Sequence, residues 1–330
     1  MSAGTDARLA LAFSEPPAAP TLLLGAPADL ESERFAPDTL AVQTDAGMNG
    51  ALTRAGWRTD VSAGQGPYAS AVVFLARARA AQRAQVAEAA RLLPARASLW
   101  VDGQKSDGIE TMLRDLRGLA TVDPLISKAH GKLFRVTIPE GPWLPDDWTA
   151  TEAQVADGFV TRPGVFSADG PDPASLLLAQ ALPPRLPTRM VDLGAGWGWL
   201  AAQVLAREGV DVLHLVEADH DALTCARRNV SDPRAQFHWA DALAFRLPEP
   251  VNGVVMNPPF HGPGGNADPR LGAGFIRAAA GLLTGAGRLW MVANRHLPYE
   301  AELASHFRQV EEIGGNGAFK VITASGARRS

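Results

Sequence analysis

The 330-residue sequence has a single cysteine, no long apolar run and no cluster of metal-binding side chains. The lone Cys225 cannot form a disulfide within the chain, which favours a reducing compartment such as the cytoplasm. Residues 1–13 include Asp6 and Arg8 and lack the sustained apolar core of a secretory signal. The uncharged apolar stretches are too short to span a membrane, and no Cys and His residues have the spacing of metal ligands. We therefore expect a cytoplasmic protein that holds no metal ion and does not enter a membrane.

Excess positive charge is also missing, since the formal net charge is −4, and this does not favour nucleic-acid binding. The basic residues are nevertheless clustered. Residues 77–96 contain five arginines against one acid, Glu88, and a second cluster consists of Lys128, Lys132 and Arg135. A solvated helix face explains the arginines at least as well as an RNA contact does, so charge alone leaves the substrate open.

A glycine loop is the first positive signal for a ligand site. Residues 189–193 form a short apolar strand that continues into Gly194, Gly196 and Gly198, and a helical pattern follows over residues 199–207. Glycines in such a loop allow close approach of the backbone to a ligand at the start of a helix. The spacing Gly-x-Gly-x-Gly lacks the extra residue of the dinucleotide fingerprint, which disfavours a nicotinamide-dependent oxidoreductase.

Acidic or amide side chains end four successive predicted strands. These side chains are Asp192, Glu217, Asp241 and Asn257. The carboxyl ends of parallel strands meet at one edge of a sheet, where such folds bind ligands. Glu217 can accept hydrogen bonds from ribose hydroxyls and Asp241 from an adenine amino group, whereas Asp192 could also serve only to hold the loop. The predicted cofactor-binding residues are Asp192, Gly194, Gly196, Gly198, Glu217, Asp241 and Asn257.

The tetrad Asn257-Pro258-Pro259-Phe260 directly follows an apolar run, residues 251–256. Two prolines cannot continue a sheet ladder, so the chain must leave the sheet there. An amide oxygen and a fixed carbonyl can orient a planar NH2 group while the aromatic ring stacks on its plane. The tetrad resembles the signature of amino-group methyltransferases that use S-adenosylmethionine, although Asn-Pro alone is also an ordinary turn opener.

The two halves of the chain resemble each other, and the length suffices for two domains. Residues 21–27, 71–74, 98–102 and 131–136 correspond in order and spacing to 189–196, 253–256, 288–292 and 317–321. In the first copy Pro27 and Asp29 replace Gly196 and Gly198, and residues 75–78 replace the tetrad. We predict an α/β fold with two Rossmann-like, class I methyltransferase domains, the first a degenerate copy.

The predicted domain boundaries follow from this repeat. Residues 1–140 form the degenerate domain, with a role in substrate recognition or packing. Residues 141–160 form a linker, and residues 161–330 form the catalytic domain. All parallel α/β domains share such strand and turn patterns, which is the alternative to a true repeat.

The chain resembles the bacterial small-subunit ribosomal RNA guanine-N2 methyltransferases of the RsmC type. The resemblance is carried by Pro163-Gly164-Val165-Phe166-Ser167, Asp169-Gly170, Asp172, residues 192–196, residues 257–261, Val292-Ala293-Asn294, Leu297-Pro298-Tyr299 and Phe319-Lys320-Val321. It is dense over residues 160–325 and only architectural over residues 1–140. The chain departs from the family at Pro173-Ala174, where a glycine-containing step is usual, and in the bulky Trp197 and Trp199 of the glycine loop.

The resemblance implies S-adenosyl-L-methionine as the cofactor and ribosomal RNA or the small ribosomal subunit as the partner. We expect the protein to be a monomer. The implied reaction methylates the exocyclic N2 amine of a guanine in 16S ribosomal RNA. The implied catalytic residues are Asn257 and Pro258, which accept from the amine, and Phe260, which stacks on a flipped base. Weaker candidates for substrate binding are His261, Asn294 and Tyr299.

Three other readings remain open on the residues alone. The same tetrad serves adenine-N6 methylation and, with tyrosine in the last position, methylation of a protein glutamine. Those enzymes would share the cofactor site and differ in the acceptor. A non-catalytic RNA-binding module is disfavoured because Asn257 and the glycine loop are intact.

Overall fold

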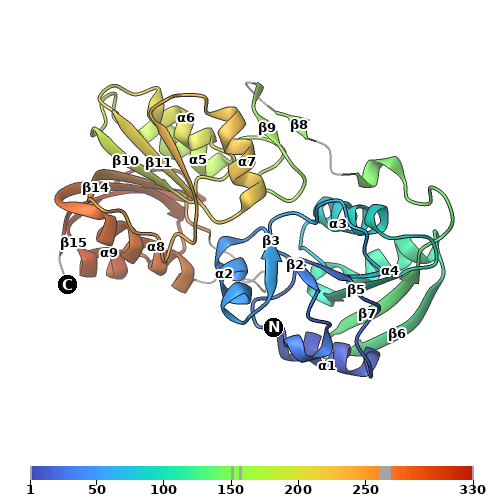
Figure 1. Cartoon of the computed structure of the whole chain (residues 1–330). Helices are drawn as coiled ribbons and strands as arrows, with labels where there is room; N and C mark the ends of the chain where they lie inside the picture. The colour runs from blue at the N-terminus through green and yellow to red at the C-terminus, as the bar shows by residue number, and fades with distance from the viewer. Residues whose placement is uncertain (1, 150–151, 156–157, 260–268, 329–330) are drawn as a thin grey trace. The chain divides into compact units, whose positions relative to one another are not determined.

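The computed structural model describes residues 2–149, 152–155, 158–259 and 269–328. The chain divides into two compact units, Met1–Glu152 and Ala153–Ser330 (Figure 1). Each unit contains one seven-stranded mixed sheet. None of the helices in the described ranges has the length and apolar composition needed to cross a membrane.

The sheet of the first unit has the strand order β3-β2-β1-β4-β5-β7-β6. Strands β1 to β5 pair in parallel, and β7 pairs antiparallel with both β5 and β6. The elements in chain order are α1 (Ser2–Ala12), β1 (Thr21–Leu24), η1 (Ser32–Arg34), β2 (Leu40–Val42), α2 (Ala46–Arg54), β3 (Arg58–Asp60), β4 (Ser70–Phe74), α3 (Arg79–Leu92), β5 (Ser98–Gln104), η2 (Lys105–Asp107), α4 (Ile109–Arg117), β6 (Val122–Lys128), β7 (Gly131–Thr137) and η3 (Asp146–Trp148).

The sheet of the second unit has the order β12-β11-β10-β13-β14-β16-β15. A two-stranded pair, β8 with β9, precedes it. The elements are β8 (Ala153–Gln154), β9 (Val160–Thr161), α5 (Pro173–Ala181), β10 (Arg189–Leu193), α6 (Trp199–Leu205), β11 (Val212–Glu217), α7 (His220–Asn229), β12 (Ala235–Trp239), β13 (Val251–Met256), α8 (Pro269–Leu282), β14 (Leu283–Asn294), α9 (Glu300–His306), β15 (Phe307–Gly315) and β16 (Phe319–Ala327).

The two sheets have the same strand order, so the predicted fold of two Rossmann-like units is confirmed. Each pair of segments matched in the sequence occupies equivalent strands: β1 and β10, β4 and β13, β5 and β14, β7 and β16. The units differ after the first glycine turn. In the second unit α6 follows the turn, whereas in the first unit the described chain between β1 and β2 contains only the 3-10 turn η1. The first copy therefore lacks the helix on which a cofactor loop depends.

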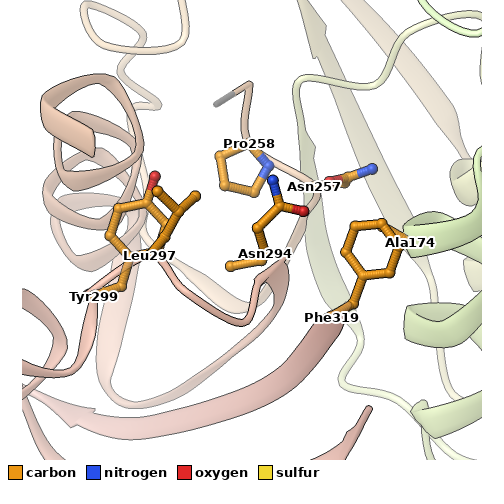
Figure 2. A pocket seen from close by; sticks show the side chains of 8 residues that line it. Ala174, Asn257, Pro258, Asn294, Leu297, Tyr299 and Phe319 are labelled. Atoms are coloured by element: carbon orange, nitrogen blue, oxygen red, sulfur yellow. The ribbon is translucent and has the colours of Figure 1, made fainter. Parts of the chain in front are cut away.

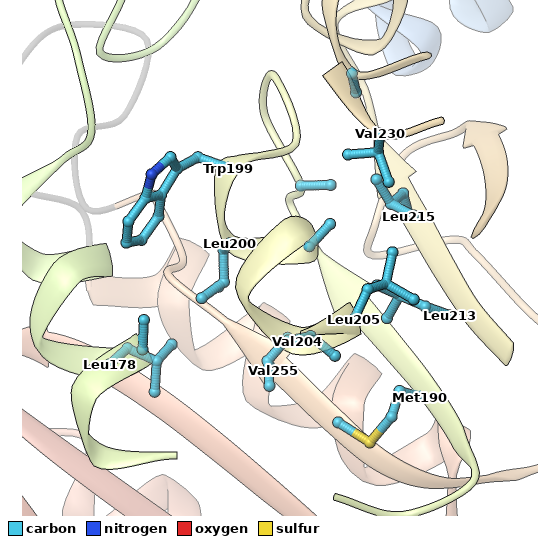
Figure 3. Close-up of a cluster of buried hydrophobic side chains, with 14 of the residues drawn as sticks. Leu178, Met190, Trp199, Leu200, Val204, Leu205, Leu213, Leu215, Val230 and Val255 are labelled. Atoms are coloured by element: carbon cyan, nitrogen blue, oxygen red, sulfur yellow. The ribbon is translucent and has the colours of Figure 1, made fainter. Parts of the chain in front are cut away.

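Both faces of the second sheet are covered by helices. Residues of α5, α6 and α7 pack against one face, with Leu178, Leu200 and Met190 among the buried side chains (Figure 3). Residues of α8 and α9 cover the other face, where Val191 and Ile276 are buried. Successive side chains of a strand point to opposite faces, so adjacent Met190 and Val191 enter different cores. Strand β14 is longer than the segment matched in the repeat, because it already begins at Leu283, directly after α8.

A buried ion pair attaches α1 to the sheet of the first unit. Arg8 Nε donates to Asp102 Oδ1 at 2.6 Å and Arg8 Nη2 donates to Asp102 Oδ2 at 2.8 Å. Thr5 Oγ1 donates to the same carboxylate at 3.1 Å, and Arg8 Nη1 donates to the carbonyl of Lys128 at 3.1 Å. Arg8 is fully buried and Asp102 is 3% exposed. The guanidinium thereby joins α1, β5 and the end of β6.

We expect Arg8→Met to destabilise the first unit by about 3–5 kcal/mol, because it leaves the Asp102 carboxylate buried without its partner. The double variant Arg8→Met with Asp102→Leu should recover most of that loss, because no unpaired charge remains. Urea unfolding gives the stabilities, and hydrogen exchange of the β5 and β7 amides identifies the unit that opens. Equal destabilisation of the single and double variants would contradict this account.

Candidate active site

The parallel strands of the second sheet bring the predicted cofactor residues to one edge. The amides of Gly194 and Ala195 both donate to the carbonyl of Val216, at 2.9 and 3.0 Å, so the loop after β10 lies against the end of β11. Glu217 Oε2 then accepts from the amide of Gly196 at 2.7 Å. Asp241 follows β12, where its Oδ1 accepts from the amide of Leu243 at 2.9 Å. The acids predicted from the sequence therefore flank the glycine loop.

The glycine loop has backbone conformations that other residues adopt poorly. Gly194, Gly196 and Gly198 have φ values of +84°, +55° and +88°. A Cβ at Gly198 would lie 2.9 Å from the side chain of Val230, whereas a Cβ at Gly196 would meet nothing within 4 Å among the described residues. The loop is therefore packed closely at Gly198 and open at Gly196. The first unit cannot reproduce it, because Pro27 at the equivalent position has its φ fixed near −65°.

Asp192 is a fully buried carboxyl group with no hydrogen-bond partner among the described residues for either oxygen. Burial, together with the nearby charge of Glu217, raises the pKa of Asp192 to about 8. Burial and the charge of Asp221 similarly raise the pKa of Asp219 to about 7. Three neighbouring acids at one glycine loop disfavour the pyrophosphate of a dinucleotide and favour a cationic ligand.

S-adenosylmethionine fits this set of carboxylates. Its ammonium and sulfonium groups are cations that would stabilise the ionised form of Asp192. Its ribose hydroxyls suit Glu217, and its adenine amino group suits Asp241. The open side of the loop at Gly196 allows close backbone approach to such a ligand.

The segment that precedes α5 is bonded to the glycine loop. Trp197 Nε1 donates to the carbonyl of Phe166 at 3.0 Å. Asn229 Nδ2 donates to the carbonyls of Val160 and Trp197, both at 2.8 Å, and Asn229 Oδ1 accepts from the amide of Val160 at 2.8 Å. The bulky Trp197 thus anchors this segment, and Trp199 packs in the core beside Leu200 (Figure 3).

Asn257 is held by a hydrogen-bond clamp from α5, which we call the Asn257 clamp and which consists of Asp172 and Ser175. Asn257 Nδ2 donates to Asp172 Oδ2 at 2.8 Å and to Ser175 Oγ at 2.9 Å. Asp172 also caps α5, because its Oδ2 accepts from the amide of Ser175 at 2.9 Å. Both hydrogens of the Asn257 amide nitrogen are therefore used, which leaves Oδ1 to accept from another group.

A small pocket adjoins Asn257 (Figure 2). It is lined by Ala174, Asn257, Pro258, Ala293, Asn294, Leu297, Tyr299 and Phe319. The structure thus brings the predicted substrate residues Asn294 and Tyr299 together with Asn257 and Pro258. Tyr299 is only 2% exposed, and its hydroxyl lies where a Cβ on Gly272 would stand, 2.0 Å away. Gly272 is thus needed to make room for this wall of the pocket.

The loop after β14 is fixed by two basic side chains. Lys320 Nζ donates to the carbonyl of Leu297 at 2.8 Å and also contacts Glu300. Arg295 Nε donates to the carbonyl of Asn316 at 2.7 Å, and Arg295 Nη2 donates to that of Phe319 at 3.1 Å. The motifs Leu297-Pro298-Tyr299 and Phe319-Lys320-Val321 are therefore in direct contact, through the hydrogen bond from Lys320 to Leu297.

The comparisons with known proteins agree with this geometry. The family model for the methyltransferase small domain matches residues 157–323. A ribosomal RNA small subunit methyltransferase C from Pseudomonas paraeruginosa is 30% identical over 93% of this chain and 95% of the relative. A protein of the same description from Hahella chejuensis is 31% identical over 76% of each chain. The chain belongs to the ribosomal RNA small subunit methyltransferase C family.

A solved member of this family has the same fold over both units. It is the T. thermophilus 16S rRNA N2 G1207 methyltransferase (RsmC) in complex with AdoMet and guanosine. The TM-score is 0.79 at 27% identity, with 97% of this chain and 91% of that chain covered. The methyltransferase C fold therefore extends to the first unit, where the sequence resemblance is only architectural.

Several residues of the site were not found by sequence reasoning. Ser175, Asn229 and the bonding role of Asp172 are absent from the predicted site, although an Asp directly before a Pro at a helix start is a recognisable N-cap pattern. The predicted residues Phe260 and His261 lie outside the described residues. Within the described ranges no group of three or more His, Cys, Asp or Glu residues could hold a metal ion.

We expect Asp192→Asn to raise the stability of the cofactor-free protein, with a gain that grows as the pH rises. The pKa of Asp192 is raised to about 8 in the folded protein from an ordinary value of 3.8, so the wild type loses stability as the pH rises between these values. The neutral amide has no such loss, and the difference can grow by at most about 1.4 kcal/mol per pH unit. Urea unfolding from pH 4 to 8.5 measures it. A pH-independent difference would contradict the assignment.

Proposed function

We propose that this chain transfers the methyl group of S-adenosylmethionine to the exocyclic N2 amine of a guanine in 16S ribosomal RNA. The observation that carries the proposal is the Asn257 clamp. It fixes the amide nitrogen of Asn257 on Asp172 and Ser175, at the end of the strand beside the glycine loop, so that Oδ1 is presented to an amine. Relatives over nearly the full chain are described as ribosomal RNA small subunit methyltransferase C. The T. thermophilus protein of similar fold is described with AdoMet and guanosine.

The proposed mechanism is mainly one of positioning. Bound S-adenosylmethionine supplies a methyl group already activated by its sulfonium. Asn257 Oδ1 and the carbonyl of Pro258 accept the two amine hydrogens, which directs the nitrogen lone pair at that methyl group. A nitrogen–carbon bond forms as the carbon–sulfur bond breaks, and the amine proton then passes to solvent. Among the described residues, those that line the pocket include no carboxylate and no histidine. None of these lining residues can therefore act as a carboxylate or histidine general base.

The guanine is proposed to leave its stack and bind with its face on Phe260. Stacking of one base on an aromatic side chain contributes roughly 1–3 kcal/mol, so Phe260 would affect binding without being needed for chemistry. Asn294 and Tyr299 are proposed to border the base. The active species is proposed to be a cytoplasmic monomer that needs no metal ion, with the first unit as a platform for the substrate.

The proposal is tested by methyl transfer from labelled S-adenosylmethionine to small subunits from cells that lack guanine-N2 methylation. Free ribosomal RNA, DNA and release factor are assayed in parallel, and Asn257→Ala serves as the inactive control. We expect label in ribosomal RNA that digests to N2-methylguanosine. Asn257→Ala should lose transfer but bind S-adenosylhomocysteine nearly as tightly as the wild type.

Label on DNA or release factor would move the acceptor to adenine-N6 or to a protein glutamine. Stabilisation of the protein by NADH but not by S-adenosylhomocysteine would exclude a methyltransferase. Loss of both transfer and cofactor binding in Asn257→Ala would mean that this residue belongs to the cofactor site.

The Asn257 clamp makes a separate prediction for Ser175, which does not itself line the pocket and acts through its hydrogen bond to Asn257. Ser175→Ala removes one of the two acceptors of the Asn257 amide and keeps the backbone cap of Asp172. We expect kcat to fall about fivefold, equivalent to about 1 kcal/mol for one hydrogen bond. Cofactor affinity should not change, and Ser175→Thr should restore kcat. Ser305→Ala, which removes a hydroxyl bonded only within α9, is the matched control. Equal kcat in the wild type and Ser175→Ala would contradict the clamp.

A further inference from the structure

Lysines are scarce in this chain and unevenly placed. Only four of the 31 basic residues are lysines: Lys105, Lys128, Lys132 and Lys320. Lys320 is 3% exposed and donates to the carbonyl of Leu297, one of the residues that line the pocket. The other three all lie in the first unit, where they gather at the end of one hairpin.

The hairpin is formed by β6 and β7, and its tip carries the positive groups. Lys128 is paired with Gly131, and Ser127 with Lys132, across the two strands. The amide of Lys105 donates to the carbonyl of His130 at 3.0 Å, which places the start of η2 beside the tip. Lys105, Lys128 and His130 are exposed. We call Lys105, Lys128, His130 and Lys132 the lysine tip.

The backbone of the lysine tip is fixed in an unusual conformation. Ala129 and His130 have φ values of 51° and 57°, the left-handed region that residues other than glycine rarely adopt. Arg8, held by Asp102, donates from Nη1 to the carbonyl of Lys128 at 3.1 Å. A Cβ at Gly131 would lie 2.4 Å from the same nitrogen, so only glycine fits there. The buried ion pair of Arg8 and Asp102 therefore holds the backbone of the tip in place through the carbonyl of Lys128.

The charge of the tip stands out against the rest of the first unit. Residues 1–152 contain 15 basic and 18 acidic side chains. In the arginine cluster of the α3 region, Arg79 and Arg83 both pair with Asp115 and Arg96 pairs with Glu140. At the tip, Lys132 pairs with Glu110 at 3.4 Å. Among the described residues Lys105 and Lys128 form no ion pair, so their charges are available to a partner.

We propose that the lysine tip binds the phosphate backbone of the RNA substrate. Lysine ammonium groups on a rigid turn act as point charges that attract phosphates, and such contacts position a nucleic acid without reading its sequence. The inference rests on the proposed ribosomal RNA substrate and gives the first unit, which has no cofactor loop, a physical role in holding it. If the lysine tip bound an acidic protein surface and not RNA, replacement of its lysines would leave the affinity for RNA unchanged.

The double variant Lys105→Glu with Lys128→Glu tests the proposal on the full chain. The matched control is Arg58→Glu with Arg91→Glu, which makes the same change in net charge on exposed residues of β3 and α3. Strand β3 lies at the opposite edge of the sheet from β6. RNA binding is measured as a function of salt, and methyl transfer is measured separately at saturating RNA.

We expect the lysine variant to lose RNA affinity about tenfold or more at moderate salt. The slope of log affinity against log salt should fall by about 0.7 for each lost contact to a single strand. Its kcat at saturating RNA should match that of the wild type. Unchanged binding in the lysine variant, or an equal loss in the control, overturns the proposal. Lysine-dependent RNA binding without any methyl transfer by the wild type would contradict the proposed function and leave this inference supported.

A second measurement needs no substitution. Acetylation by an N-hydroxysuccinimide ester, followed by peptide mass spectrometry, reports the reactivity of each lysine. Because Lys320 is buried, the lysines that are acetylated readily are expected to be those of the lysine tip. We expect bound RNA to slow the acetylation of Lys105 and Lys128 several-fold, and equal rates with and without RNA would overturn the proposal.

Discussion

The parallel pairing of β10 with β11 and β13 is the constraint on which the site depends. Asp192 is paired with Leu215 on one side and with Val255 on the other, and this register sets where each strand ends. A shift of one residue would turn every side chain of a strand to the opposite face. The acids, the glycine loop and Asn257 then would not meet at one edge. The two cores, one on each face of the sheet, fix the register by burying alternate side chains.

The two units show how one strand order can lose a cofactor site and remain folded. Pro27 cannot adopt the backbone conformation of Gly196, and the helix after the turn is reduced to η1. Neither change touches the strands, so the seven-stranded sheet is kept. The cofactor edge needs glycine at particular backbone angles, whereas the sheet needs only apolar side chains at alternate positions. The residues that form a cofactor loop can therefore be replaced without loss of the sheet.

The sequence predicted those parts of the structure that local patterns determine. The strands, the glycine loop and the repeat follow from apolar runs and glycine spacing. The hydrogen bonds of Asn257 and Asn229 were missed because their partners are distant in the chain. Asn257 is 85 residues from Asp172, and Asn229 is 69 residues from Val160. The structure adds a distant residue to part of the basic cluster noted in the sequence. Arg135 lies over the ring of Trp100, 5.9 Å from its centroid, and Lys105 takes its place at the lysine tip.

The identical strand order of the two sheets has a consequence for the order of assembly. Equivalent strands in two similar sheets could exchange places during folding, which is a characteristic failure of chains with repeated domains. Each sheet here is built from one continuous stretch, residues 1–152 or 153–330. During synthesis the first sheet can therefore close, with all its strands paired, before the first strand of the second leaves the ribosome. Continuity of each unit along the chain thus protects a duplicated fold from mixing its own halves.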